Sequence, residues 1–526
     1  MAKIKYLAAI LVLIAFATGC SKDFLEKEPL TDRVEANFYK TPDDALQALV
    51  AIYDVLGWQC GNGYHPYDLV CNILSDDAYA GGSGPGDRPD LVRMGKLSNY
   101  PSDEAVLGLW ADRYAGVYRA NLLLEKIEGI PFEDETLKTR YIAEARFLRA
   151  YFYFQLEQFY GNIPLILKTL SPTDKKIPQA SPAEVYNQIA EDLWFAWQNL
   201  PANVSSAELG RATKWAAGGM LARVYLYHKG YGKNVLGITS DLKAGEKTIT
   251  EDVVEGIIDD IVNTSGHGLV PSYADLFYPG NKNSIESIFE IQHTQKSNWG
   301  DWGWRNGSEG NWTVIMSGFR GVESDLYESG WSFQPVTQSL ADEMKTDPRY
   351  SVSILDAQAE GLVYKPGDCF QHTGYACKKV HPLKAFKPST NDMLNWPYNE
   401  KVLRFADILL MGAELYLDND LSKAQNYFNR VYRRAYGASA NPPQLSNSEA
   451  GLDIIYHERR MEFAGEGLRY WDLLRRGLDY AQQKINAAAK ASPQDETFNP
   501  ATRGLLPIPQ SEITLSENTL VQNPGY

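Results

Sequence analysis

The residues best suited to chemistry or recognition lie in one stretch, residues 298–333. It holds five of the twelve tryptophans, and these are Trp299, Trp302, Trp304, Trp312 and Trp331. Gly, Ser, Asn and Asp separate them, so neither a helical nor a two-residue period fits, and this composition is typical of a surface loop. Exposed indoles suit a ligand with a flat apolar face, such as a sugar ring. Alternatively, the rings pack together as a small core under the loop, and composition does not separate these two possibilities.

A second long irregular stretch, residues 57–101, is rich in glycine and polar residues. Loops of this length are usually functional or disordered. We therefore predict that the two stretches together form a ligand site, with the five tryptophans as stacking surfaces. The residues predicted to supply polar or edge contacts are Tyr64, Tyr79, Asn99, Asn306 and Arg320.

Three acids recur every four residues near the C-terminus, and these are Glu458, Glu462 and Glu466. Paired carboxylates could hydrolyse a glycosidic bond if that face lined a cleft. Otherwise like charges at this spacing require cations opposite them, and the candidates are Arg146, Arg149 and Arg404. Because the sequence indicates no cleft here, ion pairing is favoured and no catalytic residue is predicted.

Metal and cofactor sites are not indicated by the sequence. His457 and Glu458 begin like a zinc-protease helix, but the second His four residues after the first is missing. No Cys-x-x-Cys pair is present, which argues against a structural zinc site. We therefore predict no metal and no cofactor.

The charge balance narrows the class of ligand. The 526 residues carry a formal net charge of −15. Nucleic acid requires a basic face, so nucleic-acid binding is not expected. The same balance argues against a polyanionic glycan.

The first 19 residues read as a leader and not as part of the fold. Lys3 and Lys5 precede an apolar run that is too short to span a bilayer. The next residues, Ala-Thr-Gly-Cys20, resemble the lipobox of bacterial lipoproteins, although Ala17 stands where Leu is usual. The resemblance implies cleavage before Cys20, its acylation, and a polar tether over residues 20–40.

The remaining cysteines form two sequence-close pairs in a chain expected to be exported. They are Cys60, Cys71, Cys369 and Cys377. Two local disulfides and four unpaired buried thiols are both compatible with the spacing.

Apolar periodicity predicts a mainly α-helical body with a few short strands. Helices are expected from residue 42 and over 103–127, 133–160, 182–199, 213–228, 252–261, 273–277, 335–344, 402–417, 422–436 and 454–474. Strands are expected over 287–293, 350–355 and 378–381. The pair 402–417 and 422–436 has about the length of a tetratricopeptide helix–turn–helix unit.

Several segments together resemble the SusD/RagB family of outer-membrane nutrient-binding lipoproteins of Bacteroidetes. They include AEARFLRAYFYFQLEQFYGNIPL (143–165), NWGDWGWRNGSEGN (298–311), HERRMEFAGEGLRYWDLLRRG (457–477) and LLPIPQSEITLSENTLVQNPGY (505–526). The resemblance implies one body of tetratricopeptide-like helical hairpins with an irregular, loop-rich ligand region. An N-terminal helical part is expected over 41–280 and a C-terminal part over 281–526.

The same resemblance implies a surface-exposed protein held at the outer membrane by lipidated Cys20. Its expected partner is a TonB-dependent, SusC-like barrel, to which it delivers an oligo- or polysaccharide. A peptide-binding RagB-like protein and a surface glycoside hydrolase are the alternatives. The family's ligand residues vary, so none is carried over to this chain.

Overall fold

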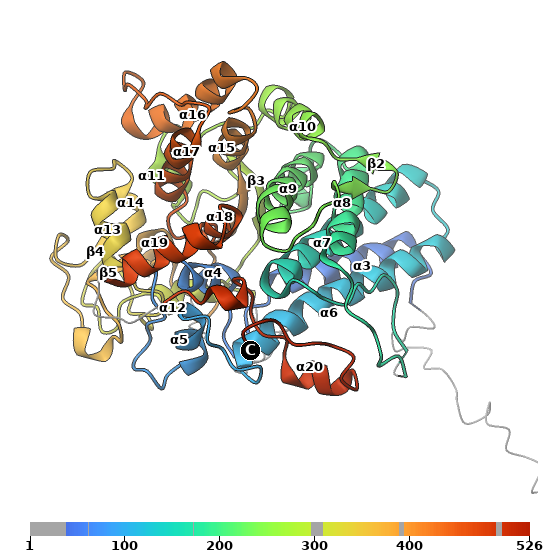
Figure 1. Ribbon diagram of the computed structural model, residues 1–526, viewed down its shortest axis with the longest axis horizontal. Coiled ribbons are helices and arrows are strands. Elements are labelled where there is room, and N and C mark those ends of the chain that lie inside the picture. Colours follow the sequence, from blue (N-terminus) through green and yellow to red (C-terminus); the bar gives the residue numbers. More distant parts are fainter. Residues whose placement is uncertain (1–37, 61–62, 172, 296–308, 389–393, 491–496) are drawn as a thin grey trace, which may run out of the picture.

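The computed structural model describes residues 38–60, 63–171, 173–295, 309–388, 394–490 and 497–526, and it is mainly helical (Figure 1). The N-terminal helices are α3 (Pro42–Asp54), α4 (Tyr67–Leu74), α5 (Pro89–Gly95), α6 (Glu104–Lys126), α7 (Glu135–Tyr160), α8 (Pro182–Asn199), α9 (Lys214–Tyr227) and α10 (Glu251–Thr264). The C-terminal helices are α11 (Tyr273–Leu276), α12 (Trp312–Ser317), α13 (Gln338–Met344), α14 (Tyr350–Ser353), α15 (Phe405–Leu415), α16 (Leu421–Tyr436), α17 (Glu449–Glu462), α18 (Arg469–Arg475), α19 (Leu478–Lys490) and α20 (Gln510–Leu515).

The strands are short and pair two by two. β1 (Lys243–Ala244) pairs with β2 (Lys247–Thr248), β3 (Ser287–Ile291) with β6 (Glu400–Arg404), and β4 (Ile354–Asp356) with β5 (Tyr375–Cys377), all antiparallel. Consecutive helices α6 to α9 pack on one another, as do α15 and α16. The prediction of helical hairpins with a few short strands is therefore confirmed.

Helix starts follow the local sequence signals. Thr41 caps α3 and forms a capping box with Asp44, and Ser181 does the same for α8 with Glu184. Proline follows both caps, at the first helical position, where its missing N–H costs nothing. These side chains satisfy backbone N–H groups that have no partner inside the helix.

Several predicted boundaries are wrong, and glycine explains one of them. The helix expected over 454–474 is two helices, because the backbone turns at Gly465 and Gly467, whose φ angles are +78° and +71°. A Cβ atom at Gly465 would lie 2.5 Å from the Cys377 sulfur, and one at Gly467 would lie 2.8 Å from Asp68 Oδ1. Only glycine accommodates both the φ angle and the close approach.

Tertiary pairing accounts for the other differences. The helix expected from residue 402 begins as strand β6, which pairs with β3. The strand expected over 350–355 is α14 followed by β4, and the strand expected over 378–381 is largely a 3-10 turn after β5. The irregular stretches contain α4 and α5 in 57–101 and α12 in 298–333. The largest hydrophobic cluster draws on residues before and after residue 280, so that division stays a prediction.

Buried ion pairs join the C-terminal segment to the rest of the body. Arg460 pairs with Asp76 and Asp77 after α4, and Arg469 also pairs with Asp76, at 2.8 Å. Arg459 pairs with Asp407 on α15 at 2.6 Å. All six side chains are at most 7% exposed. Charges removed from water to this extent are tolerated only when paired and hydrogen-bonded.

Glu157 on α7 is a buried acid with no cation beside it among the described residues. The residue is fully buried, and neither carboxyl oxygen has a hydrogen-bond partner of ordinary geometry in the described part of the chain. Burial raises the pKa of Glu157 to about 8, and its interaction with the Tyr186 hydroxyl offsets this only in part. The carboxyl group is therefore held protonated at neutral pH.

We predict that Glu157 makes the protein less stable as the pH rises. Because its pKa in the folded state lies above the ordinary value, its stabilisation is complete below about pH 4.5 and is lost as the pH rises towards about 8. Glutamine cannot ionise, so Glu157→Gln should reduce the fall in the free energy of unfolding between pH 5 and 8.5 by about 3 to 5 kcal/mol. Urea unfolding of both proteins between pH 5 and 8.5 measures it. Parallel pH profiles for the two proteins would contradict the prediction.

Candidate functional site

The described part of the aromatic stretch forms one compact cluster with Tyr64. The ring centroids of Tyr64 and Trp312 lie 5.2 Å apart, and those of Tyr64 and Trp331 lie 5.8 Å apart. Tyr64 and Trp331 are half-buried, whereas Trp312 is 1% exposed. Two rings therefore reach the surface over a third that supports them from inside.

Backbone hydrogen bonds place these rings. Asn311 caps α12, and the Trp312 N–H donates to Gln59 Oε1 at 2.7 Å. The N–H groups of Trp331 and Phe333 donate to the carbonyls of Ile315 (2.8 Å) and Met316 (2.7 Å) on α12. The extended segment around residue 331 is thereby fastened along the helix, and Trp331 is held beside Tyr64.

Arg320 lies at the edge of this cluster and is partly exposed. It pairs with Asp87 at 3.1 Å and donates from Nε to Ser332 Oγ at 3.1 Å. The Arg88 guanidinium stands 5.5 Å from the Tyr64 ring centroid and is itself paired with Asp90. The positive charges beside the rings are thus each matched by a carboxylate.

Other predicted contact residues are placed differently. Trp299, Trp302, Trp304 and Asn306 lie outside the described residues, so their role stays a prediction. The structure brings Tyr64 and Trp331 together, with Arg320 bound to the neighbouring Ser332, and their contact with a ligand stays a prediction.

Exposure was predicted wrongly for Trp312, Tyr79 and Asn99, which are at most 2% exposed. Trp312 begins a buried helix. The Tyr79 N–H donates to the Pro335 carbonyl at 3.0 Å, and Asn99 donates to Asp103 at 2.9 Å, so the structure uses both to hold the chain together.

Asp87 and Ser332 are the contacts that the sequence did not reveal. Asp87 follows a glycine-rich turn, and its carboxylate also accepts from the N–H and the hydroxyl of Ser83. Its distance in sequence from Arg320 hides the pairing. The charged pair Asp87–Arg88 directly after the glycines is the only local signal.

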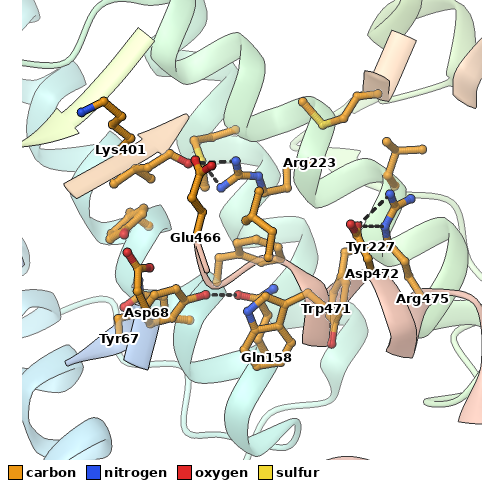
Figure 2. Close-up of a pocket in the computed structure, with 18 of the residues that line it drawn as sticks. Tyr67, Asp68, Gln158, Arg223, Tyr227, Lys401, Glu466, Trp471, Asp472 and Arg475 are labelled. Carbon is orange, nitrogen blue, oxygen red and sulfur yellow. Dashed lines mark hydrogen bonds and ion pairs between the residues drawn. The ribbon is translucent and has the colours of Figure 1, made fainter. Parts of the chain in front are cut away.

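An interior cavity of about 50 Å³ lies between α4, α7, α9, β6 and α18. Figure 2 shows its polar lining, which includes Asp68, Lys401 and Glu466, and the Tyr67 hydroxyl donates to Gln158 at 3.3 Å. Burial, followed by the nearby Glu400 and Glu466 carboxylates, raises the pKa of Asp68 well above its ordinary value. A space of this size holds a few water molecules and is too small for a sugar ring.

The three C-terminal acids are committed to ion pairs. Glu458 pairs with Arg349 at 2.7 Å, Glu462 with Arg349 (3.0 Å), Arg404 (2.9 Å) and Arg434, and Glu466 with Arg404 and Lys379 (both 2.7 Å). Arg404 was among the predicted partners. The prediction that Arg146 and Arg149 pair with these glutamates was wrong, because both arginines pair with Asp192. Burial would raise the pKa of Glu462, but the three arginines more than offset it and hold that pKa well below its usual range.

The remaining sequence expectations concern thiols, metals and membranes. Cys60, Cys71, Cys369 and Cys377 are buried and form neither of the two local disulfides, so the disulfide alternative is not adopted. Among the described residues, no group of three or more His, Cys, Asp or Glu could hold a metal ion. Within the same residues, no helix is long and apolar enough to cross a bilayer.

Comparison with protein families finds two matches. Residues 93–226 match a family described as "Starch-binding associating with outer membrane", and residues 363–526 match the SusD family. A curated SusD-like protein of Bacteroides ovatus is 28% identical over 490 residues, which cover 90% of this chain and 82% of the relative.

Solved structures give the same result. A laminarin-binding SusD-like protein is 32% identical, with a TM-score of 0.80 over 93% of this chain and 100% of its own. Surface glycan-binding protein A of Bacteroides thetaiotaomicron, solved in complex with laminarihexaose, is 25% identical, with a TM-score of 0.79 over 92% of this chain and 100% of its own.

We predict that Glu462→Gln damages the fold and not a catalytic step. The substitution leaves three buried guanidinium groups short of one counter-charge, which should cost about 3 to 5 kcal/mol of the free energy of unfolding. Chemical denaturation measures the loss. Asp342→Gln, which removes a half-exposed partner of Lys345, is the control and should cost less than about 1 kcal/mol. A variant of unchanged stability that has lost a glycan-hydrolysing activity would contradict the prediction.

Proposed function

Because the chain belongs to the SusD family, we propose that it is a cell-surface protein that captures a neutral glycan and delivers it to a TonB-dependent, SusC-like transporter. The observation that carries the proposal is the half-buried pair Tyr64 and Trp331, with Arg320 and Asp87 at its edge. A sugar ring lies flat on such rings, while an arginine and a carboxylate supply the donors and acceptors that hydroxyl groups require.

The charges around the rings favour an uncharged ligand. Arg320 is matched by Asp87 and Arg88 by Asp90, so no unpaired cation is offered to a uronate or sulfate group by these four residues. Laminarin is a neutral polymer of glucose. One similar protein is a laminarin-binding SusD-like protein, and another was solved in complex with laminarihexaose. We therefore propose a laminarin-like glucan as the ligand.

The proposed delivery step needs no chemistry from the protein. The buried acids of the C-terminal segment are neutralised by arginines and lysine, which supports binding without hydrolysis. Lipidated Cys20, with residues 20–37 outside the described part of the chain, would keep the protein beside its transporter.

We predict that Trp331→Ala weakens laminarin binding about tenfold to a hundredfold, because one stacking surface contributes about 1 to 3 kcal/mol. Tyr64→Ala should act in the same direction. Isothermal titration with laminarin hexamers measures the affinity. Trp194→Ala, which removes another half-buried indole on the distant helix α8, is the control and should leave the affinity unchanged.

Two results would contradict the proposed site. The first is laminarin affinity that survives loss of both Tyr64 and Trp331. The second is preferential binding of a polyanionic glycan such as polygalacturonate. Retention of peptides without response to any neutral glycan would favour the peptide-binding alternative.

We predict that Cys20→Ser moves the protein out of the membrane fraction, since the acceptor of the lipid is lost. Immunoblots of fractionated cells measure the shift. Laminarin affinity of the purified variant should be unchanged. From detergent-solubilised membranes, the unaltered protein should co-purify with a TonB-dependent barrel. A Cys20→Ser protein that stays in the membrane fraction would contradict the anchoring proposal.

A further inference from the structure

A second concave surface lies away from the aromatic cluster, between α6, residues 164–170 and 173–177, and α20. α6 and α20 lie beside each other at the lower edge of Figure 1. The groove has a volume of about 510 Å³, ten times that of the interior cavity. Pockets that bind small molecules span roughly 300 to 1,000 Å³. It shares no lining residue with the cluster around Tyr64, so it is a separate site.

The walls of this groove are mainly aliphatic. They include Val117, Ile166, Leu170, Ile177, Leu515 and Leu520. Trp110 is 4% exposed, so the aromatic surface comes from Tyr114 and Tyr118, and the aliphatic side chains outnumber these two rings. A hydrocarbon chain therefore fits these walls better than a carbohydrate does.

A hydrogen bond and an exposed ion pair join the segments that form the groove. The Tyr114 hydroxyl on α6 donates to the Pro164 carbonyl at 2.8 Å. Lys176 pairs with Glu517, directly after α20, at 3.0 Å. The groove is therefore built into the fold from three separate segments.

Exposed apolar side chains gather around the groove. Tyr118 is 50% exposed and Leu515 is 61% exposed, and both line it. Leu167 (42%) and Val521 (69%) are each adjacent in sequence to a lining residue. A cluster of this kind marks an interaction site more often than isolated exposed residues do. Its concave form suits a single chain better than the flat surface of a bilayer.

The rim carries two lysines and two acids, Lys168, Lys175, Asp174 and Glu512. Lys168 and Lys175 are exposed and take part in no ion pair in the described part of the chain. The Asp174 carboxylate accepts a hydrogen bond from the Ser171 N–H at 2.8 Å. Burial raises the pKa of Glu512 above its ordinary value. In a chain of net charge −15, the two ammonium groups without an ion-pair partner are the part of this rim that can meet an anion.

We propose that the groove binds a single-chain anionic amphiphile of the fatty-acid class. The hydrocarbon lies along Val117, Leu170 and Leu515, and the carboxylate lies beside Lys168 and Lys175. This inference is independent of the proposed glycan function, because the two sites have no residue in common.

Equilibrium dialysis of the full chain carrying Cys20→Ser, purified without detergent, against labelled dodecanoate tests the proposal. Dodecanoate is used below its micellar concentration, and one saturable site is expected. Leu515→Glu should weaken binding about tenfold or more, because it places a carboxylate in the apolar groove. The double variant Lys168→Glu/Lys175→Glu should weaken it to a similar extent. Leu421→Glu and Lys243→Glu make matched changes elsewhere on the surface and should have no effect.

Three further binding measurements distinguish this proposal from its alternatives. Uncharged 1-dodecanol should bind about tenfold more weakly than dodecanoate if the lysines recognise the carboxylate. Trp331→Ala should leave dodecanoate binding unchanged, so that failure of the glycan site and failure of this site are distinguished. Absence of a saturable site, or binding indifferent to Leu515→Glu, overturns the proposal. Binding to phosphatidylglycerol vesicles without binding to monomeric dodecanoate also overturns it and assigns the patch to a membrane surface.

Discussion

The structure depends on a set of charges that have been removed from water. Glu462 is fully buried, and Arg349 and Arg404 are each 1% exposed. A charge buried in this way costs several kcal/mol unless a partner of opposite sign is held against it. Arg404 contacts Glu286, Glu462 and Glu466 at once, so β6, the segment before β3 and the end of α17 must all be in place together. The ion pairs therefore specify one arrangement of the helices.

These ion pairs give the interior a structural role and leave the proposed ligand recognition to the surface. Glu458, Glu462 and Glu466 are each paired with a cation, and the cavity nearby holds only about 50 Å³. Proton transfer to a substrate would require one of these acids to leave its partner. Recognition through the aromatic rings at the surface has no such requirement, because stacking and hydrogen bonding leave the ion pairs intact.

Local signals in the sequence were sufficient to predict where helices begin. They were not sufficient to predict which distant segments contact one another. Thr41 and Ser181 cap helices whose starts could be predicted, because the capping side chain and its backbone N–H are three residues apart. The need of Glu462 for cations could also be predicted. Of its partners Arg349, Arg404 and Arg434, only Arg404 was named, since their positions depend on how distant segments meet.

Trp312 and Trp331 also show that local sequence does not predict long-range contacts. Trp312 and Trp331 occur in a single glycine-rich stretch and could not be distinguished by composition. Their roles diverge because Asn311 starts a helix that turns Trp312 inward, while the Trp331 N–H, bound to the Ile315 carbonyl, keeps that indole beside Tyr64 at the surface. A buried ring under two partly exposed rings reduces their freedom. For the proposed glycan site, this leaves less ordering to oppose binding, which is the physical basis of preorganisation.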